Sequence, residues 1–146
     1  MTNRLPLAAA LALLATTARA DAGADFAAKA AKEPGAVKTA SGLVYKSLAD
    51  GKGPQPTAAA TVKVNYEGTF IDGKVFDSSR RNGGPISFPL NRVIPCWTEG
   101  VQKMRVGGKA RLVCPPSIAY GERGAPGAIP PNSTLVFEVE LLDIAQ

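Results

Sequence analysis

The segment 93–104 constrains the fold more than any other, because it holds the only tryptophan of the chain. Trp97, Val101 and Met104 recur at i, i+4 and i+7, the spacing of side chains on one face of a helix. Val106-Gly107-Gly108 ends this helix after about two or three turns. Because so short a helix is not stable alone, it must pack on a larger element. We therefore expect a helix lying across a sheet, with Trp97 pointing into the concave side; an ordinary core position for Trp97 is the alternative.

Strand patterns surround this helix. Residues 61–66 alternate apolar and polar side chains, Asp72-Gly73 predicts a type I′ hairpin turn, and Pro89 is typical of an edge strand. The main strand patterns lie at residues 43–48, 61–66, 86–90, 109–114 and 134–144. Together they predict an α+β fold, in which an antiparallel five-stranded half-barrel sheet wraps on one short central helix. At 146 residues the chain is one domain by length.

The composition excludes several kinds of chemistry. The chain has no histidine, so it has no Ser-His-Asp triad, no His-ligated zinc and no imidazole base. Two cysteines without histidine do not complete a zinc site, so we expect neither metal nor cofactor. The basic residues are scattered, without aromatic residues between them, which argues against nucleic acid as a partner.

The first 20 residues are typical of a signal peptide. Arg4 precedes the apolar run 5–15, and Ala18-Arg19-Ala20 offers small residues at the cleavage positions. The run is shorter than the ~20 residues that span a membrane, so we expect no stable membrane insertion after cleavage. A buried N-terminal helix is the alternative. Cleavage would leave a mature chain that begins near Asp21 in the oxidising periplasm, with a net charge of +3 once Arg4 and Arg19 are removed from the 17 basic and 12 acidic residues.

Residues 21–40 form a short leader before the domain predicted over residues 41–146. Segment 25–33 is rich in helix formers, and Pro34-Gly35 ends it, so the leader is predicted to be partly helical. It is either a frayed leader or a small docking helix. We expect a monomer, because the leader is too short and polar to build a dimer interface of standard size.

Most of the aromatic residues fall at positions that face the predicted core or the mouth of a loop. They are Tyr66, Phe76, Phe88, Trp97, Tyr120 and Phe137. With Val93, Ile94 and Ile129, they are positioned to line a small apolar pocket with Trp97 as its floor. The alternative is an ordinary aromatic core.

Six motifs resemble, in order and spacing, the FKBP-type peptidyl-prolyl cis–trans isomerases. The resemblance covers roughly residues 42–144. The motifs are Val64-Asn65-Tyr66-Glu67-Gly68, Gly73-Lys74-Val75-Phe76-Asp77-Ser78-Ser79, Val93-Ile94-Pro95-Cys96-Trp97-Thr98-Glu99-Gly100, Ala119-Tyr120-Gly121, Ile129-Pro130-Pro131-Asn132 and Thr134-Leu135-Val136-Phe137.

The resemblance implies an isomerase that rotates X-Pro bonds in unfolded or partly folded polypeptides and is inhibited by macrolides such as rapamycin or tacrolimus. Trp97 would lie beneath the proline ring, Asp77 at the rim, and the Tyr120 hydroxyl would donate to a substrate carbonyl. Phe88 would sit deeper, behind the wall, and Ile129 would cover one side. The walls would be Tyr66, Phe76, Val93, Ile94 and Phe137. Two alternatives remain: a binding module or holdase for unfolded proteins, and a purely structural export protein.

The two cysteines are predicted to form a disulfide, Cys96–Cys114. Export permits the bond. Alternation in strand 109–114 puts Cys114 on the face of Ala110 and Leu112, which we interpret as the inward face, under the helix that begins at Cys96. The alternative is that both are small buried hydrophobic residues that never meet.

Overall fold

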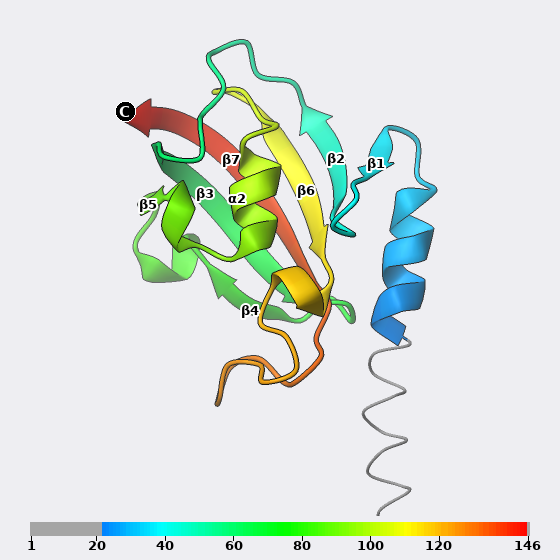
Figure 1. Cartoon of the computed structure of the whole chain (residues 1–146). Helices are drawn as coiled ribbons and strands as arrows, with labels where there is room; N and C mark the ends of the chain where they lie inside the picture. Colours follow the sequence, from blue (N-terminus) through cyan, green and yellow to red (C-terminus); the bar gives the residue numbers. More distant parts are fainter. Residues whose placement is uncertain (1–21, 146) are drawn as a thin grey trace, which may run out of the picture.

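A computed structural model of the chain describes residues 22–145, and the signal peptide predicted over residues 1–20 lies outside them. One antiparallel sheet carries the short helix α2 (Pro95–Val101) across one face (Figure 1). The strand order is β1-β2-β6-β7-β3-β4, and β5 pairs with β3. The strands are β1 (Ala36–Lys38), β2 (Val44–Ala49), β3 (Thr61–Phe70), β4 (Val75–Ser78), β5 (Ile86–Pro89), β6 (Lys109–Cys114) and β7 (Leu135–Ala145). Short 3-10 turns are η1 (Arg80–Asn82), η2 (Leu90–Arg92) and η3 (Pro116–Ile118).

The predicted α+β class is confirmed, but the predicted number of five strands is wrong, because the sheet has seven. The additional strands are β1 and β4. Strand β1 has three residues, too few for alternation to be recognised in the sequence, whereas β4 is the arm that follows the hairpin turn predicted at Asp72-Gly73. Strand β1 lies within the predicted leader and pairs with β2, so the leader and the domain share one sheet.

The two longest strands, β3 and β7, pair with each other over almost their whole length. As the alternation predicts, one face of this pair is apolar, and Val64, Leu135, Val139 and Leu141 on it are 0% exposed. Full burial of such a side chain contributes about 1.5–3 kcal/mol, so each of these four residues stabilises the fold. Helix α2 packs on the same face and belongs to the same core.

The β3–β4 hairpin has a three-residue loop, so the predicted type I′ turn is wrong. That turn needs positive φ at two central residues, whereas only Gly73 has it here, with φ 90°. The Gly73 N–H donates to the Phe70 carbonyl, and the Phe70 N–H donates to the Lys74 carbonyl, both at 2.9 Å. The Asp72 carboxylate accepts from the Lys74 N–H at 2.9 Å and so stabilises the longer loop.

The leader contains a docked helix. Residues 22–31 are helical and pack Phe26 and Ala30 against Val44 and Val113, on the sheet face opposite α2. Just after the helix, the Glu33 carboxylate lies 3.0 Å from the Lys46 ammonium, which lowers the pKa of Glu33. Of the two possibilities that the sequence left open, the docking helix is therefore the one observed.

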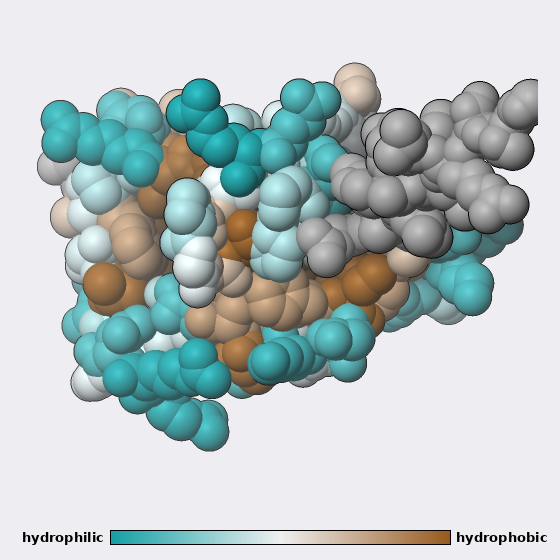
Figure 2. All heavy atoms as spheres, turned by 90° about the horizontal axis from the view of Figure 1, so that it is seen from below, coloured by the Kyte–Doolittle hydropathy of each residue, from teal (hydrophilic) through white to brown (hydrophobic). Residues whose placement is uncertain are grey.

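The N-terminal end of the same helix lies next to residues 130–134, at the lower end of the sheet in Figure 1. Gly23 lies so close to Thr134 that a Cβ there would overlap the threonine side chain. Seen from below, a band of apolar side chains runs between hydrophilic ones (Figure 2). At this end, a groove of about 440 Å³ lies between the first described residue of the helix, the β3–β4 hairpin and residues 130–134. Within residues 22–145, no helix is long and apolar enough to cross a membrane.

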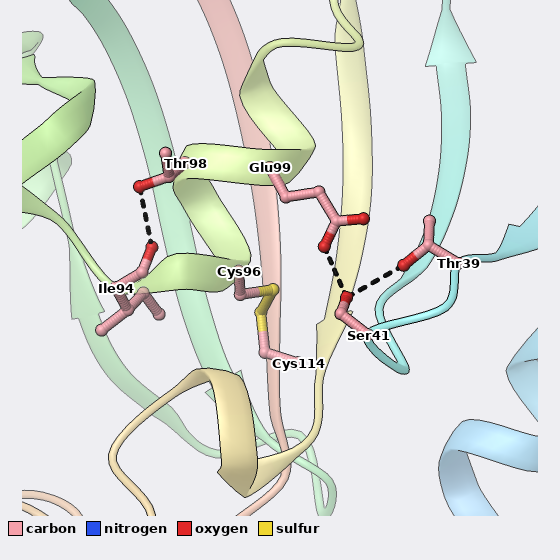
Figure 3. Close-up of a disulfide and its surroundings, with 7 residues drawn as sticks. All are labelled: Thr39, Ser41, Ile94, Cys96, Thr98, Glu99 and Cys114. Atoms are coloured by element: carbon pink, nitrogen blue, oxygen red, sulfur yellow. Dashed lines mark hydrogen bonds between the residues drawn. A yellow bond between two sulfur atoms is a disulfide. The ribbon is translucent and has the colours of Figure 1, made fainter. Parts of the chain in front are cut away.

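Helix α2 is fixed to the sheet by close packing and by a covalent bond. A Cβ at Gly100 would lie 2.8 Å from a methyl group of Leu112, so glycine lets the helix approach β6 closely. Cys96, in the first turn of α2, forms a disulfide with Cys114 at the end of β6, with a Cα–Cα distance of 5.8 Å (Figure 3). This is the pairing predicted from the sequence. Both cysteines are fully buried, and Cys114 lies on the inward face as expected.

Polar contacts hold the solvent side of α2. The Ser41 hydroxyl, in the turn between β1 and β2, donates to the Glu99 carboxylate (Figure 3). The Thr98 hydroxyl donates to the Leu90 carbonyl at 2.6 Å and so links α2 to η2. The helix is thus attached to three segments: β6, the β1–β2 turn and η2.

Replacing both cysteines, Cys96→Ala with Cys114→Ala, is expected to lower the free energy of unfolding by about 3 kcal/mol, because the bond closes a loop in the unfolded chain. The sequence separation of the bonded residues is 18. Urea unfolding of the oxidised wild type and of the double variant measures the difference. Reduced wild-type protein is the control and should unfold near the variant's midpoint. Equal midpoints for the oxidised wild type and the double variant would show that the bond does not stabilise the fold.

Candidate active site

A cavity of about 490 Å³ opens between α2, the end of β4 and the apolar face of the sheet. Aromatic and branched aliphatic side chains dominate its lining, and two charged residues join them. The lining residues are Tyr66, Phe76, Asp77, Phe88, Arg92, Val93, Ile94, Trp97, Tyr120 and Phe137. A concave apolar site with a few polar groups is the usual form of a binding site for a small organic group.

Trp97 lies at the centre of the aromatic lining and is only 4% exposed. Its indole packs edge-to-face against Tyr66, Phe88 and Phe137, with ring centroids 5.3, 5.5 and 5.5 Å apart. This geometry is favoured by the quadrupoles of aromatic rings and holds the indole in one orientation. The Trp97 Nε1 is the one buried side-chain nitrogen or oxygen among residues 22–145 without a hydrogen-bond partner.

Gly68 on β3 lies behind two rings of the cavity wall. A Cβ at this position would lie 2.6 Å from Phe76 and 2.9 Å from Phe137. The two rings pack edge-to-face, with centroids 5.6 Å apart. The absence of a side chain at Gly68 therefore gives the two rings the space they occupy.

The carboxylate of Asp77 is held at the rim by three donors. It accepts from the Tyr66 hydroxyl at 2.7 Å, from the Ser78 N–H at 2.9 Å and from the Asn82 amide at 3.1 Å. Burial and the hydrogen bond to Asp77 raise the pKa of the Tyr66 phenol well above its ordinary value. Tyr66 is thus protonated at neutral pH, and its proton is directed at Asp77.

Tyr120 stands at the mouth of the cavity, after η3, and is 41% exposed. Its hydroxyl makes no hydrogen bond to another residue of the described part of the chain. A free phenolic hydroxyl at the mouth of an apolar cavity is a donor available to a bound molecule.

The structure brings together every predicted pocket residue except Ile129. Ile129 is 6% exposed and belongs to the core; its backbone pairs with Ala125 through hydrogen bonds of 2.7 and 2.9 Å. It therefore supports the loop instead of covering the cavity. Phe88 is partly exposed and lines the cavity, where it packs edge-to-face against Tyr66 and Trp97.

Arg92 lines the cavity but was not among the predicted residues. It directly precedes Val93 and Ile94, two of the predicted pocket residues, and this position in the sequence is the signal that points to it. No group of three His, Cys, Asp or Glu residues within 22–145 is arranged to hold a metal ion.

The cavity and its surrounding fold have close counterparts among known proteins. The sequence profile of the family described as FKBP-type peptidyl-prolyl cis-trans isomerase matches residues 53–142. FkpA of Escherichia coli, named an FKBP-type peptidyl-prolyl cis-trans isomerase, is 55% identical over 122 residues, which cover 84% of this chain and 45% of FkpA. A probable FkpA of Neisseria meningitidis is 51% identical over 127 residues, which cover 87% of this chain and 47% of the relative. The chain spans about half the length of these curated relatives.

Solved structures agree with this assignment. The crystal structure of E. coli FkpA superposes with a TM-score of 0.87 at 50% identity, covering 94% of this chain and 64% of FkpA. A peptidyl-prolyl cis-trans isomerase of Pseudomonas syringae superposes with a TM-score of 0.83 at 41% identity, covering 90% of this chain and 96% of that one. Since the family profile matches more than half of the chain and the aligned segments of the relatives are about half identical to it, the chain belongs to the FKBP-type peptidyl-prolyl cis–trans isomerase family.

Proposed function

We propose that this protein is a peptidyl-prolyl cis–trans isomerase that accelerates rotation of X-Pro bonds in polypeptide chains. The observation that carries this proposal is the aromatic cavity of about 490 Å³ with Trp97 at its centre, in a chain of this family. The cavity is apolar enough to favour a proline ring over water and open enough for the polypeptide to continue on either side.

The proposed mechanism needs no proton transfer and no metal. Rotation about the X-Pro bond is slow because it breaks amide resonance, a barrier of about 18–20 kcal/mol. The planar amide is the more charge-separated form, so water favours it over the twisted transition state. An apolar site removes that preference, and hydrogen bonds made only in the twisted geometry lower the barrier further.

Each of the pocket residues predicted from the sequence has a role in this proposal. Trp97 lies beneath the proline ring, and the Tyr120 hydroxyl donates to a substrate carbonyl. Asp77 stands at the rim, where its three hydrogen bonds fix its carboxylate. Ile129 supports the loop that follows Tyr120. The walls are Tyr66, Phe76, Phe88, Val93, Ile94 and Phe137.

We further propose that the protein acts in the periplasm, on proline-containing chains that are unfolded or partly folded. The signal-peptide pattern of residues 1–20 and the Cys96–Cys114 disulfide support this location, because disulfides persist in oxidising compartments. Assistance to the folding of exported proteins is then the biological role.

A protease-coupled isomerisation assay on a short X-Pro peptide tests the activity. We expect rapamycin or tacrolimus to inhibit it, because these macrolides would occupy the same cavity as the proline ring. Binding of unfolded chains without any acceleration of isomerisation would instead favour the holdase function.

Phe137→Ala is expected to lower turnover, because it opens the wall of the cavity to water. Leu135→Ala is the matched control, since Leu135 is buried on the same strand but does not line the cavity. Each substitution should cost about 2–5 kcal/mol of unfolding free energy. Activity per folded molecule, measured well below both melting temperatures, should fall only for Phe137→Ala. Full activity of folded Phe137→Ala would refute the pocket assignment.

The rate should be nearly constant between about pH 6 and 8. The chain has no histidine, and the raised pKa of Tyr66 keeps its hydroxyl protonated throughout this range. Isomerisation rates at constant ionic strength, corrected for the protease used in the coupling, measure the profile. A bell-shaped profile in this interval would indicate acid–base catalysis and contradict the mechanism.

The mature protein is expected to be a monomer. The helix over residues 22–31 packs Phe26, Ala27, Ala30 and Ala31 on its own sheet, so we expect these side chains not to form a dimer interface. Sedimentation equilibrium at micromolar concentration should give the mass of one chain, and twice that mass would contradict the expectation.

A further inference from the structure

Arg92 is the one cation among the described residues that line the aromatic cavity. It is exposed at the end of η2, and its guanidinium forms no hydrogen bond or salt bridge within residues 22–145. Most of the other arginines among the described residues have a hydrogen-bond or ion-pair partner for the guanidinium. Arg111, for example, forms ion pairs with Glu33 and Glu138. Arg92 thus presents an unpaired positive charge beside an apolar site.

Asp77, the other charged residue of the cavity, already has hydrogen-bond partners. Its carboxylate already accepts hydrogen bonds from Tyr66, Ser78 and Asn82. These bonds occupy the carboxylate and fix it in place, so a cationic ligand would have to share it with three donors. Of the two charged groups at the cavity, Arg92 is therefore the one available to a charged ligand.

The backbone that carries Arg92 is fixed. Leu90, at the start of η2, is 0% exposed, its N–H donates to the Ala60 carbonyl at 3.0 Å, and its carbonyl accepts from the Thr98 hydroxyl at 2.6 Å. The base of the Arg92 side chain is consequently held at the rim, while the guanidinium remains free to meet a partner. Ordering one flexible side chain is then the main entropic cost of forming an ion pair there.

We infer that Arg92 determines substrate preference, favouring X-Pro segments with an acidic side chain next to the proline. The inference rests on the proposed isomerase function. A guanidinium matches a carboxylate in shape and donates two parallel hydrogen bonds to it. Because Arg92 is unpaired in the free protein, no existing ion pair has to break. An exposed ion pair of this kind corresponds to roughly a twofold to fivefold gain in kcat/KM.

The test uses matched peptides that carry Glu, Gln or Lys directly before the proline, and a second set with the same residues directly after it. Values of kcat/KM are measured at low and high salt for the wild type, Arg92→Gln and Arg92→Glu. Arg80→Gln is the control, because Arg80 is also exposed and without a side-chain partner in the described chain but lies on η1, outside the cavity. It removes the same charge from the protein as a whole.

In at least one set, the wild type should prefer Glu over Gln by roughly twofold to fivefold at low salt, and Lys should be the poorest substrate. Arg92→Gln should lose this preference, Arg92→Glu should reverse it, and Arg80→Gln should retain it. Activity toward the Gln peptides should stay close to that of the wild type for Arg80→Gln, which lies outside the cavity. Equal rates for Glu, Gln and Lys in both sets, or a preference that survives Arg92→Gln, would overturn the inference. Absence of activity toward every peptide, the Gln ones included, would instead refute the proposed isomerase function.

Discussion

Attachment of a two-turn helix to the sheet is the constraint on which the rest of the structure depends. A helix of seven residues has no stability of its own, yet it carries Trp97, around which the cavity is arranged. The protein fixes it by a glycine that allows close approach to Leu112, by the disulfide to β6 and by hydrogen bonds to the β1–β2 turn and to η2. These contacts come from three other parts of the chain, β6, the β1–β2 turn and η2, so the position of Trp97 depends on the folding of all three.

The cavity combines an apolar interior with a carboxylate, that of Asp77, whose hydrogen bonds are already made. The Tyr66–Asp77 hydrogen bond places a carboxylate at the rim without leaving its charge unpaired among aromatic rings. Among the buried side-chain nitrogen and oxygen atoms of the described residues, Nε1 of Trp97 has no partner, and an unpartnered buried donor costs about 1–3 kcal/mol. That cost is carried by the well-packed rings around the indole, which supply the compensating burial.

Much of this arrangement follows from period and position in the sequence. Alternation in β3 and β7 identifies their inner faces, and the same reasoning in β6 turns Cys114 toward Cys96. Strand β1 could not be predicted in this way, because three residues contain too little alternation. The pattern also cannot place single loop residues. An apolar side chain such as that of Ile129 is compatible with a core position and with a cavity wall. An apolar pattern cannot identify Arg92, because its side chain is charged. Its position at the rim of the cavity depends on the path of η2.

Gly68 influences the width of the cavity, although it lies outside the cavity. The residue lines no part of the cavity, yet the rings of Phe76 and Phe137 occupy the volume that its missing side chain leaves. Gly68 does not have a positive φ, so the two rings, and not a left-handed backbone, exclude a side chain at position 68. A methyl group at position 68 would therefore displace the rings of Phe76 and Phe137. The width of the cavity can thus change through a residue that a bound molecule would not touch.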